Sequence, residues 1–177
     1  MKNIVLGITG SISAYKAADI ANALTKEGSS VYTVMTRAAE RFITPLTLQT
    51  LTKNKVYTDM FELDEPSQVA HIALASKADL VLIAPASADI IAKLACGIAD
   101  DMLTSVMLAV KDTPVIVCPA MNTNMYENPA TQKNIRTLKE YGFEIVEPRE
   151  AMLACGTKGK GALAEQERIL EAVHKYL

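Results

Sequence analysis

The 177-residue chain is 50% hydrophobic and 21% charged, with a formal net charge of −2 and a pI near 5.7. No block of lysine or arginine provides the basic surface that nucleic-acid binding needs, so a nucleic-acid partner is not expected. The most apolar stretch, residues 79–95, is interrupted by Asp79, Pro85, Asp89 and Lys93, which excludes a membrane-spanning helix there.

Short apolar runs alternate along the chain with segments whose apolar residues recur at helical spacing. The expected order is strand 4–8, helix 13–27, strand 31–35, helix 38–52 with a break near Pro45, strand 56–58, helix 71–77, strand 80–84, helices 87–95 and 101–110, strand 115–118, helix 129–141, strand 144–146, a loop at 147–164 and helix 165–177. Strands that are apolar throughout and alternate with helices predict a parallel sheet covered on both faces. We therefore expect a three-layer, doubly wound α/β fold, Rossmann-like or flavodoxin-like, in a single domain spanning residues 1–177.

Ligands of such sheets bind beyond the carboxyl ends of the strands, which directs attention to four segments: 9–13, 36–42, 84–90 and 118–126. The first is a tight turn in which glycine and hydroxyl residues precede a predicted helix, a setting that suits a phosphate. It matches neither G-x-G-x-x-G nor a P-loop, and a serine N-cap beside a turn glycine explains it equally well.

The next two segments narrow the class of ligand. Residues 36–38 follow the second strand and include no acidic residue for the ribose of a dinucleotide, so a mononucleotide fits better. Ala86 and Ala88 are small enough to let a flat ring approach the backbone, although Ser87 can also be read as a plain helix cap. Three such helix starts on one sheet edge predict a mononucleotide-binding α/β domain.

Cysteine and histidine usage is sparse. Cys96, Cys118 and Cys155 are widely spaced, and with only two histidines in the chain no metal site is expected. Cys96 and Cys118 are interpreted as packing residues and His174 as structural. Free thiols and the absence of a secretory pattern before residue 4 predict a cytoplasmic protein.

Four motifs occur in this order: GSISAYK at 10–16, APASAD at 84–89, PAMNTNM at 119–125 and ACG at 154–156. Together, and over essentially the whole chain, they resemble the homo-oligomeric flavin-containing cysteine decarboxylases, most closely the members that act on 4'-phosphopantothenoylcysteine in coenzyme A biosynthesis. The resemblance implies FMN, a homotrimer or a multiple of it with flavin near the subunit interface, and oxidative decarboxylation of a cysteine-derived carboxylate. A chain ending at Leu177 is expected to be monofunctional, so a separate phosphopantothenate–cysteine ligase would supply the substrate.

The resemblance also implies roles for individual residues. FMN would be bound by Gly10, Ser11, Ile12, Thr36, Arg37, Ala38, Ser87, Ala88, Asp89, Ile90 and Ala120. His71 matches the family's active-site histidine, Asn122 its substrate-carboxylate ligand, and Cys155 its proton donor, within a substrate flap at about 147–164. Thr157 and the pair Ala162-Leu163 depart from the family's usual pattern in that flap.

Other functions stay open on the sequence. A flavin prenyltransferase shares the glycine turn and the Ser-Ala opening, and a decarboxylase of peptide C-terminal cysteines would use the same core. A non-catalytic flavin-binding regulatory subunit is a third alternative. The presence of His71, Asn122 and Cys155 in one chain argues against the regulatory subunit.

Overall fold

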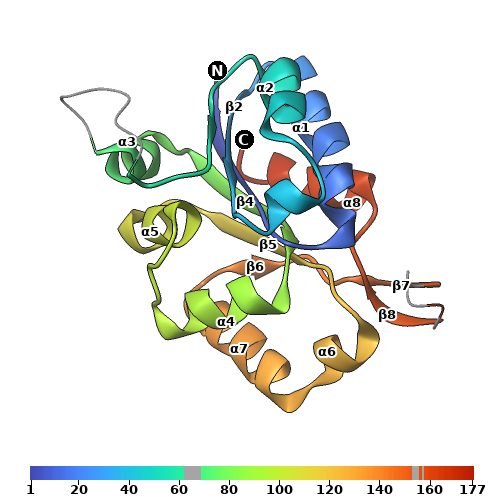
Figure 1. Ribbon diagram of the computed structural model, residues 1–177. Helices are drawn as coiled ribbons and strands as arrows, with labels where there is room; N and C mark the ends of the chain where they lie inside the picture. Colours follow the sequence, from blue (N-terminus) through green and yellow to red (C-terminus); the bar gives the residue numbers. More distant parts are fainter. Residues whose placement is uncertain (62–68, 153–155, 157) are drawn as a thin grey trace.

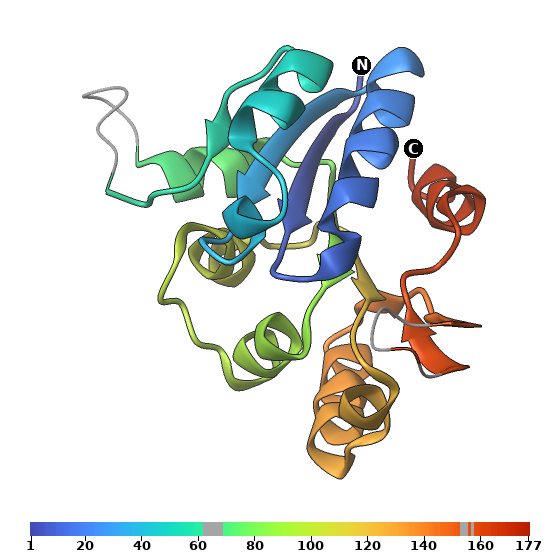
Figure 2. The ribbon, with the colours of Figure 1, turned by 45° about the vertical axis from the view of Figure 1, so that its right-hand side comes forward.

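The computed structural model describes residues 1–61, 69–152, 156 and 158–177. Its centre is a six-stranded parallel sheet with helices on both faces (Figures 1 and 2). The strands are β1 Asn3–Ile8, β2 Ser30–Met35, β3 Val56–Tyr57, β4 Leu80–Ala86, β5 Val115–Pro119 and β6 Glu144–Ile145. The predicted three-layer α/β architecture is confirmed.

The strands lie in the order β3-β2-β1-β4-β5-β6, and every neighbouring pair is parallel. The chain moves outward from β1 to β3, then returns to the other side of β1 and continues through β4 to β6. Strand order therefore reverses between β1 and β4. In doubly wound sheets, the crevice at the carboxyl ends of two such strands is where ligands bind.

Helices cover both faces of the sheet. They are the 3-10 helices Ile12–Tyr15 and Ala39–Arg41, and α1 Lys16–Lys26, α2 Pro45–Thr52, α3 Ala70–Lys77, α4 Ala88–Cys96, α5 Met102–Ala109, α6 Thr123–Glu127, α7 Pro129–Glu140 and α8 Gln166–His174. One apolar cluster joins the sheet to α1, α2 and α8, and a second joins it to α3, α4, α5 and α7. Within the described ranges, no helix has the length and apolar character to cross a membrane.

Alternation along the strands explains why both faces are apolar. In β1, Ile4 and Leu6 belong to the cluster under α1, whereas Val5 belongs to the cluster on the other face, and all three are fully buried. A strand buried on both faces must be apolar at every position, which is the pattern the sequence shows. Full burial of each such side chain stabilises the fold by roughly 1.5–3 kcal/mol.

The predicted loop at 147–164 is wrong for most of its described residues, because β7 Arg149–Met152 and β8 Lys158–Ala162 form an antiparallel hairpin there. Glycine is rare in strands, so a segment that contains Gly159 and Gly161 is not predicted to be a strand. Both are needed, since a Cβ at Gly159 would meet the Thr123 side chain and one at Gly161 would meet the Met121 carbonyl oxygen. The hairpin thus lies directly against the segment after β5.

Three smaller predictions also need correction. The segment 118–126, in which no helix was predicted, contains the short helix α6, with Asn122 as its N-cap. β4 continues through Pro85 to Ala86 instead of ending at Pro85. The helix predicted at 38–52 is only a 3-10 turn before Pro45, where α2 begins.

Candidate functional site

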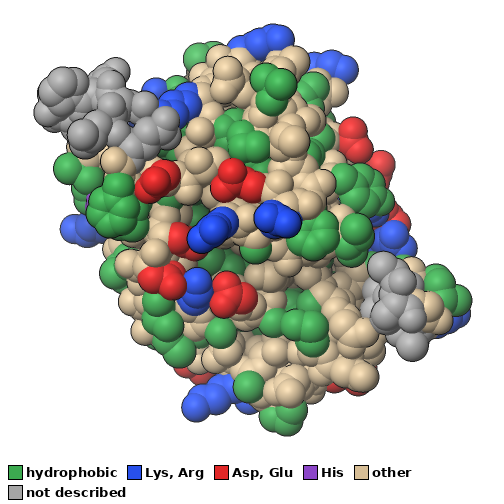
Figure 3. Space-filling model, in the orientation of Figure 1, with side chains coloured by type: hydrophobic (Ala, Val, Ile, Leu, Met, Phe, Trp, Pro, Cys, Tyr) green, Lys and Arg blue, Asp and Glu red, His purple; other side chains and the backbone are tan. Residues whose placement is uncertain are grey.

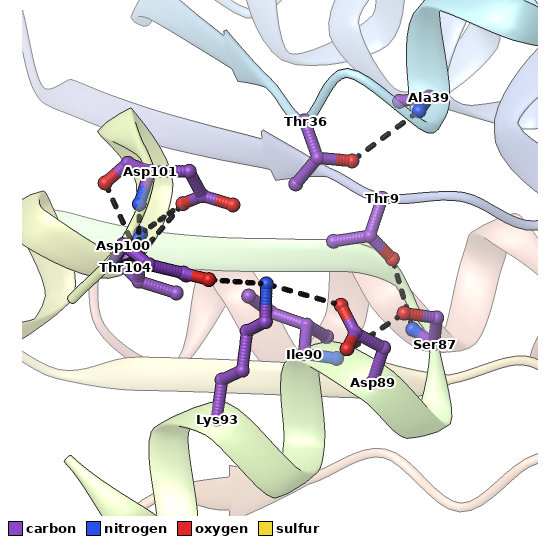
Figure 4. A network of polar contacts seen from close by, with 10 residues as sticks. All are labelled: Thr9, Thr36, Ala39, Ser87, Asp89, Ile90, Lys93, Asp100, Asp101 and Thr104. Carbon is purple, nitrogen blue, oxygen red and sulfur yellow. Dashed lines mark hydrogen bonds and ion pairs between the residues drawn. The ribbon is translucent and has the colours of Figure 1, made fainter. Parts of the chain in front are cut away.

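The ends of β1 and β4 are tied together where the strand order reverses. Thr9 Oγ1 donates a hydrogen bond to the Pro85 carbonyl oxygen at 2.7 Å. It also accepts one from the Ser87 N–H at 2.9 Å (Figure 4). Ser87 Oγ in turn accepts from the Ile90 N–H at 3.3 Å and caps α4. A single buried hydroxyl thereby fixes the two turns that the sequence singled out.

Two cavities adjoin at this edge. The first has a volume of about 470 Å³, and its lining includes Gly10, Ser11, Ile12, Ser87, Ala88, Ala120 and Asn122. The second measures about 710 Å³, and its lining includes Gly10, Thr36, Arg37, Ala38, Ser87, Ala88 and Asp89. Of the residues predicted to bind the cofactor, only Ile90 lines neither cavity; it is buried and contributes its N–H to the Ser87 cap.

The residues around these cavities fit a flavin mononucleotide. Each cavity lies within the range of roughly 300–1,000 Å³ that is typical of small-molecule sites. Ser11 caps the 3-10 helix that precedes α1, and the Ser13 N–H donates to its Oγ at 3.2 Å, so backbone donors gather where a phosphate could bind. A Cβ at Gly10 would lie 2.5 Å from the Ala38 Cβ, so only glycine lets these two turns approach each other.

Charged side chains surround the second cavity. Lys93 Nζ lies 3.1 Å from an Asp100 carboxylate oxygen and 3.5 Å from one of Asp89 (Figure 4). Burial lowers the pKa of Lys93, but its hydrogen bond to Asp100 and the nearby carboxylates outweigh burial and raise that pKa. Acidic and basic side chains are accordingly mixed on the face shown in Figure 3, with no large area of one sign.

Asn122 lies on the wall of the first cavity and is held there by local structure. It is the N-cap of α6, and its Oδ1 accepts a hydrogen bond from the Asn124 N–H at 2.8 Å. The neighbouring Met121 N–H donates to the Gly161 carbonyl oxygen of β8 at 2.9 Å. These contacts hold Asn122 in place at the wall of the cavity.

A polar cluster anchors the hairpin beside Asn122. Tyr126 OH donates to Glu147 at 2.5 Å, Lys160 Nζ lies 3.0 Å from the same carboxylate oxygen, and Lys139 Nζ lies 3.2 Å from the other. Burial raises the pKa of Glu147, but these three hydrogen bonds outweigh burial and lower the pKa to about 2. Glu147 therefore joins α6, α7 and β8 as an ionised carboxylate.

We expect Glu147→Gln to reduce the free energy of unfolding by on the order of 1 kcal/mol at pH 7, since the side chain is one-third exposed. The folded pKa lies below the unfolded value of about 4.3, so the stabilisation is present above that value and is lost as the pH falls toward 2. Urea unfolding at pH 7 and pH 3 should show the two proteins converging at low pH. Glu140→Gln, at an exposed position of α7, is the control, and an equal deficit at both pH values would contradict the prediction.

The structure does not bring every predicted catalytic residue to these cavities. His71 lies in the first turn of α3, lines neither cavity, and its Nδ1 is buried without a hydrogen-bond partner among the described residues. Helix α3 and the hairpin β7–β8 lie on opposite sides of the molecule (Figures 1 and 2). Cys155 lies outside the described residues, but β7 and β8, which flank it in sequence, both contribute to the first cavity.

The other two cysteines and the second histidine line neither of these two cavities. Cys118 is fully buried in β5, and burial raises the pKa of its thiol, whereas Cys96 is exposed at the end of α4. His174 Nε2 lies 2.9 Å from a Glu27 carboxylate oxygen and joins α8 to the end of α1. No group of three or more possible metal-binding side chains is found in the part of the chain that the structure describes.

Sequence analysis missed two charged residues that line the first cavity, Lys16 and Arg149. Lys16 could have been identified from the sequence, because it begins α1 shortly after the candidate phosphate-binding turn. Arg149 had no such signal, because it was placed in a loop and its position depends on the pairing of β7 with β8.

Comparison with known proteins extends over the whole chain. The model of the family described as Flavoprotein matches residues 1–177. A probable phosphopantothenoylcysteine decarboxylase of Streptococcus mutans is 51% identical over 177 residues, which is 99% of both proteins. The coenzyme A biosynthesis bifunctional protein CoaBC of Bacillus subtilis is 46% identical over 175 residues; the match covers 99% of this chain but only 43% of that protein.

Solved structures show the same similarity. A PPC decarboxylase mutant in complex with pantothenoylaminoethenethiol aligns with a TM-score of 0.91 and 33% identity, covering 99% of this chain and 97% of that one. The FMN-binding protein AtHal3 aligns with a TM-score of 0.88 and 34% identity, covering 99% and 96% of the two chains.

Proposed function

The chain belongs to the flavoprotein family, and from that membership we propose that it is an FMN-dependent carboxy-lyase that converts 4'-phosphopantothenoylcysteine into 4'-phosphopantetheine in coenzyme A biosynthesis. The observation that carries the proposal is the shared lining of the first cavity. Asn122, the turn at 10–12 and the hairpin that flanks Cys155 in sequence all contribute to it. This shared lining supports a role for Asn122 as carboxylate ligand beside a bound flavin.

When bound, FMN would supply the reversible two-electron redox chemistry that the reaction needs. The backbone donors at 10–12 and the start of α4 would hold its phosphate, and Ala88 and Ala120 leave room for its ring. Because β1 and β4 are joined through Thr9, these turns form a rigid edge against which the substrate can be placed.

The substrate explains why an oxidation must come first. Its carboxylate is attached to a saturated carbon, so loss of CO₂ would leave an electron pair on that carbon that no neighbouring group can delocalise. Oxidation of the carbon that bears sulfur gives a thioaldehyde, whose C=S group lies β to the carboxylate and accepts that pair. The resulting aminoenethiolate needs one hydride and one proton at carbon to become the saturated thiolate of the product.

The chain's own residues bind the carboxylate and move protons. His71 takes the proton of the substrate thiol, which would otherwise titrate at about 8.5. Asn122 donates to the carboxylate through Nδ2 and adds no positive charge that would hold CO₂ back. Cys155 gives the final proton to the carbon of the aminoenethiolate.

The position of α3 bears on how the site is completed. His71 lines neither cavity, and helix α3, which carries it, lies on the side of the molecule away from the hairpin (Figures 1 and 2). In our proposal the chain forms a homotrimer, or a multiple of it, in which His71 of one subunit completes the site formed by Asn122 and Cys155 of the next. Exposed apolar side chains next to the first cavity, such as Tyr15, Phe42 and Met125, support such a contact.

A mixture of inactive variants tests this arrangement. His71→Asn and Asn122→Asp should each be nearly inactive alone, but trimers assembled randomly from equal amounts should regain activity at about a quarter of their sites. CO₂ release after co-refolding gives the measurement. A mixture of His71→Asn with His71→Gln should regain nothing, and a failure of the first mixture to exceed this control would place the two residues in one subunit's site or in none.

The function itself is tested by substrate choice. FMN-loaded protein should release CO₂ from 4'-phosphopantothenoylcysteine and form 4'-phosphopantetheine, while a peptide ending in cysteine should be turned over far more slowly. Preference for the peptide would instead support a peptidyl-cysteine decarboxylase. FMN binding with no turnover of either compound would support a regulatory subunit.

A further inference from the structure

The charged side chains that line the first cavity are all basic among the residues that the structure describes. Lys16 and Arg149 line it, and no aspartate or glutamate occurs among the described residues of its lining. In contrast, the second cavity has Asp89 and Asp101 in its lining, beside its own basic residues. A cavity with two cations and no lining carboxylate favours ligands that carry more than one anionic group.

The two cations lie on different walls. Lys16 begins α1, immediately after the 3-10 helix at Ile12–Tyr15, and so belongs to the wall formed by the candidate cofactor-phosphate turn. Arg149 begins β7 and is paired across the hairpin with Ala162 of β8. The adjacent Gly161 accepts the Met121 N–H, next to Asn122. Arg149 therefore belongs to the wall that carries the proposed substrate ligand.

The guanidinium of Arg149 is oriented by a single neighbour. Its Nε lies 2.9 Å from Glu165 Oε1, in an ion pair that lacks the alignment of a hydrogen bond. Glu165 has a side-chain exposure of 59%, so solvent weakens the attraction between the two charges. Among the described residues no other ion pair to Arg149 is found, which leaves its two terminal nitrogens for a ligand. Arginine suits phosphate because those nitrogens can donate in parallel.

We propose that Arg149 binds the terminal phosphate of the substrate and makes the enzyme select phosphorylated over dephosphorylated pantothenoylcysteine. The inference rests on the proposed function and names a specificity-determining residue for it. Asn122 would hold the carboxylate end of the substrate, and Arg149, on the same wall, its phosphate end. Lys16 remains on the cofactor wall. Ala162, the partner of Arg149 across the hairpin, has only a methyl side chain.

The experiment compares 4'-phosphopantothenoylcysteine with pantothenoylcysteine on the FMN-loaded enzyme. The parent should show a higher kcat/KM for the phosphorylated compound. Arg149→Met should reduce the ratio of the two kcat/KM values by about tenfold to a hundredfold, the usual effect of losing charge-assisted hydrogen bonds. Its kcat/KM for pantothenoylcysteine should stay within about twofold of the parent, and Arg149→Lys should recover part of the ratio.

Two further variants separate a phosphate ligand from general effects of charge. Arg136→Met removes an exposed arginine of α7 and should leave the ratio unchanged. Lys16→Met should weaken FMN binding, measured by fluorescence titration without substrate, and leave the ratio unchanged. If Lys16→Met reduces the ratio and Arg149→Met does not, the phosphate lies on the other wall and the proposal is wrong.

The remaining outcomes are also decisive. Equal kcat/KM values for the two compounds in the parent would show that no phosphate subsite exists. An equal loss on both compounds in Arg149→Met would assign Arg149 to the structure of the hairpin. If the parent turns over neither compound although FMN is bound, it is the proposed function that fails, and the assignment of Arg149 fails with it.

Discussion

Asn122→Asp is expected to lower kcat/KM for CO₂ release by at least about a hundredfold, because it replaces a donor by a like charge facing the substrate carboxylate. The fold should survive the change. Aspartate is as good an N-cap as asparagine, and a carboxylate oxygen can still accept the Asn124 N–H that now binds Oδ1. Loss of activity would therefore come from the lost carboxylate ligand and not from unfolding of α6.

The control is Asn124→Asp, two residues further along on an exposed position of α6. It adds the same charge to the same helix, and turnover should stay close to the parent's. Both variants should keep FMN, as judged from their visible spectra. Normal turnover by Asn122→Asp, or an equal loss in the two variants, would remove Asn122 from its proposed role.

Cys155→Ser should separate the two halves of the reaction. Oxidation and CO₂ loss need a base and a held carboxylate, whereas only the return step needs a proton from Cys155. A thiol with an ordinary pKa of about 8.5 is protonated at neutral pH and can give that proton up, while a serine hydroxyl does so far less readily. We expect CO₂ release to stop after one equivalent per FMN, and formation of 4'-phosphopantetheine to fall by about 10²–10⁴-fold.

Anaerobic mixing of stoichiometric enzyme and substrate gives the measurement: the visible absorbance of the flavin should bleach and stay bleached. Cys96→Ser changes an exposed thiol at the end of α4, outside both cavities, and should behave as the parent. Parent-like formation of 4'-phosphopantetheine by Cys155→Ser would contradict its role as proton donor. No CO₂ release at all would show that Cys155 is needed before the return step.

The central sheet could be predicted because the signals for its strands lie in short stretches of consecutive residues. Residues 80–84 are apolar at every position, which a strand buried on both faces requires, and Ser87, three residues after Ala84, is a ready cap for α4. β8 could not be predicted in this way. Gly159 and Gly161 serve a close contact with the segment after β5, and nothing in the local sequence shows that this segment lies beside them.

In the site too, features set by local sequence could be predicted, whereas features set by contacts distant in sequence could not. The turns at 9–13, 36–38 and 84–90 follow strands whose carboxyl ends share one edge, so their convergence could be expected from the fold alone. Arg149 reaches the cavity only through the pairing of β7 with β8, which depends on contacts distant in sequence. His71 was matched by its motif, but a motif does not say which subunit's site a side chain enters.

The most direct test of the account is the stoichiometry of the reaction without oxygen. FMN-loaded protein is mixed anaerobically with a large excess of 4'-phosphopantothenoylcysteine, and CO₂ and 4'-phosphopantetheine are counted per FMN. An oxidation that the same FMN reverses predicts equal amounts of both products over many turnovers, with the flavin oxidised at the end. CO₂ that stops at one equivalent per FMN, or no CO₂ at all, would contradict it.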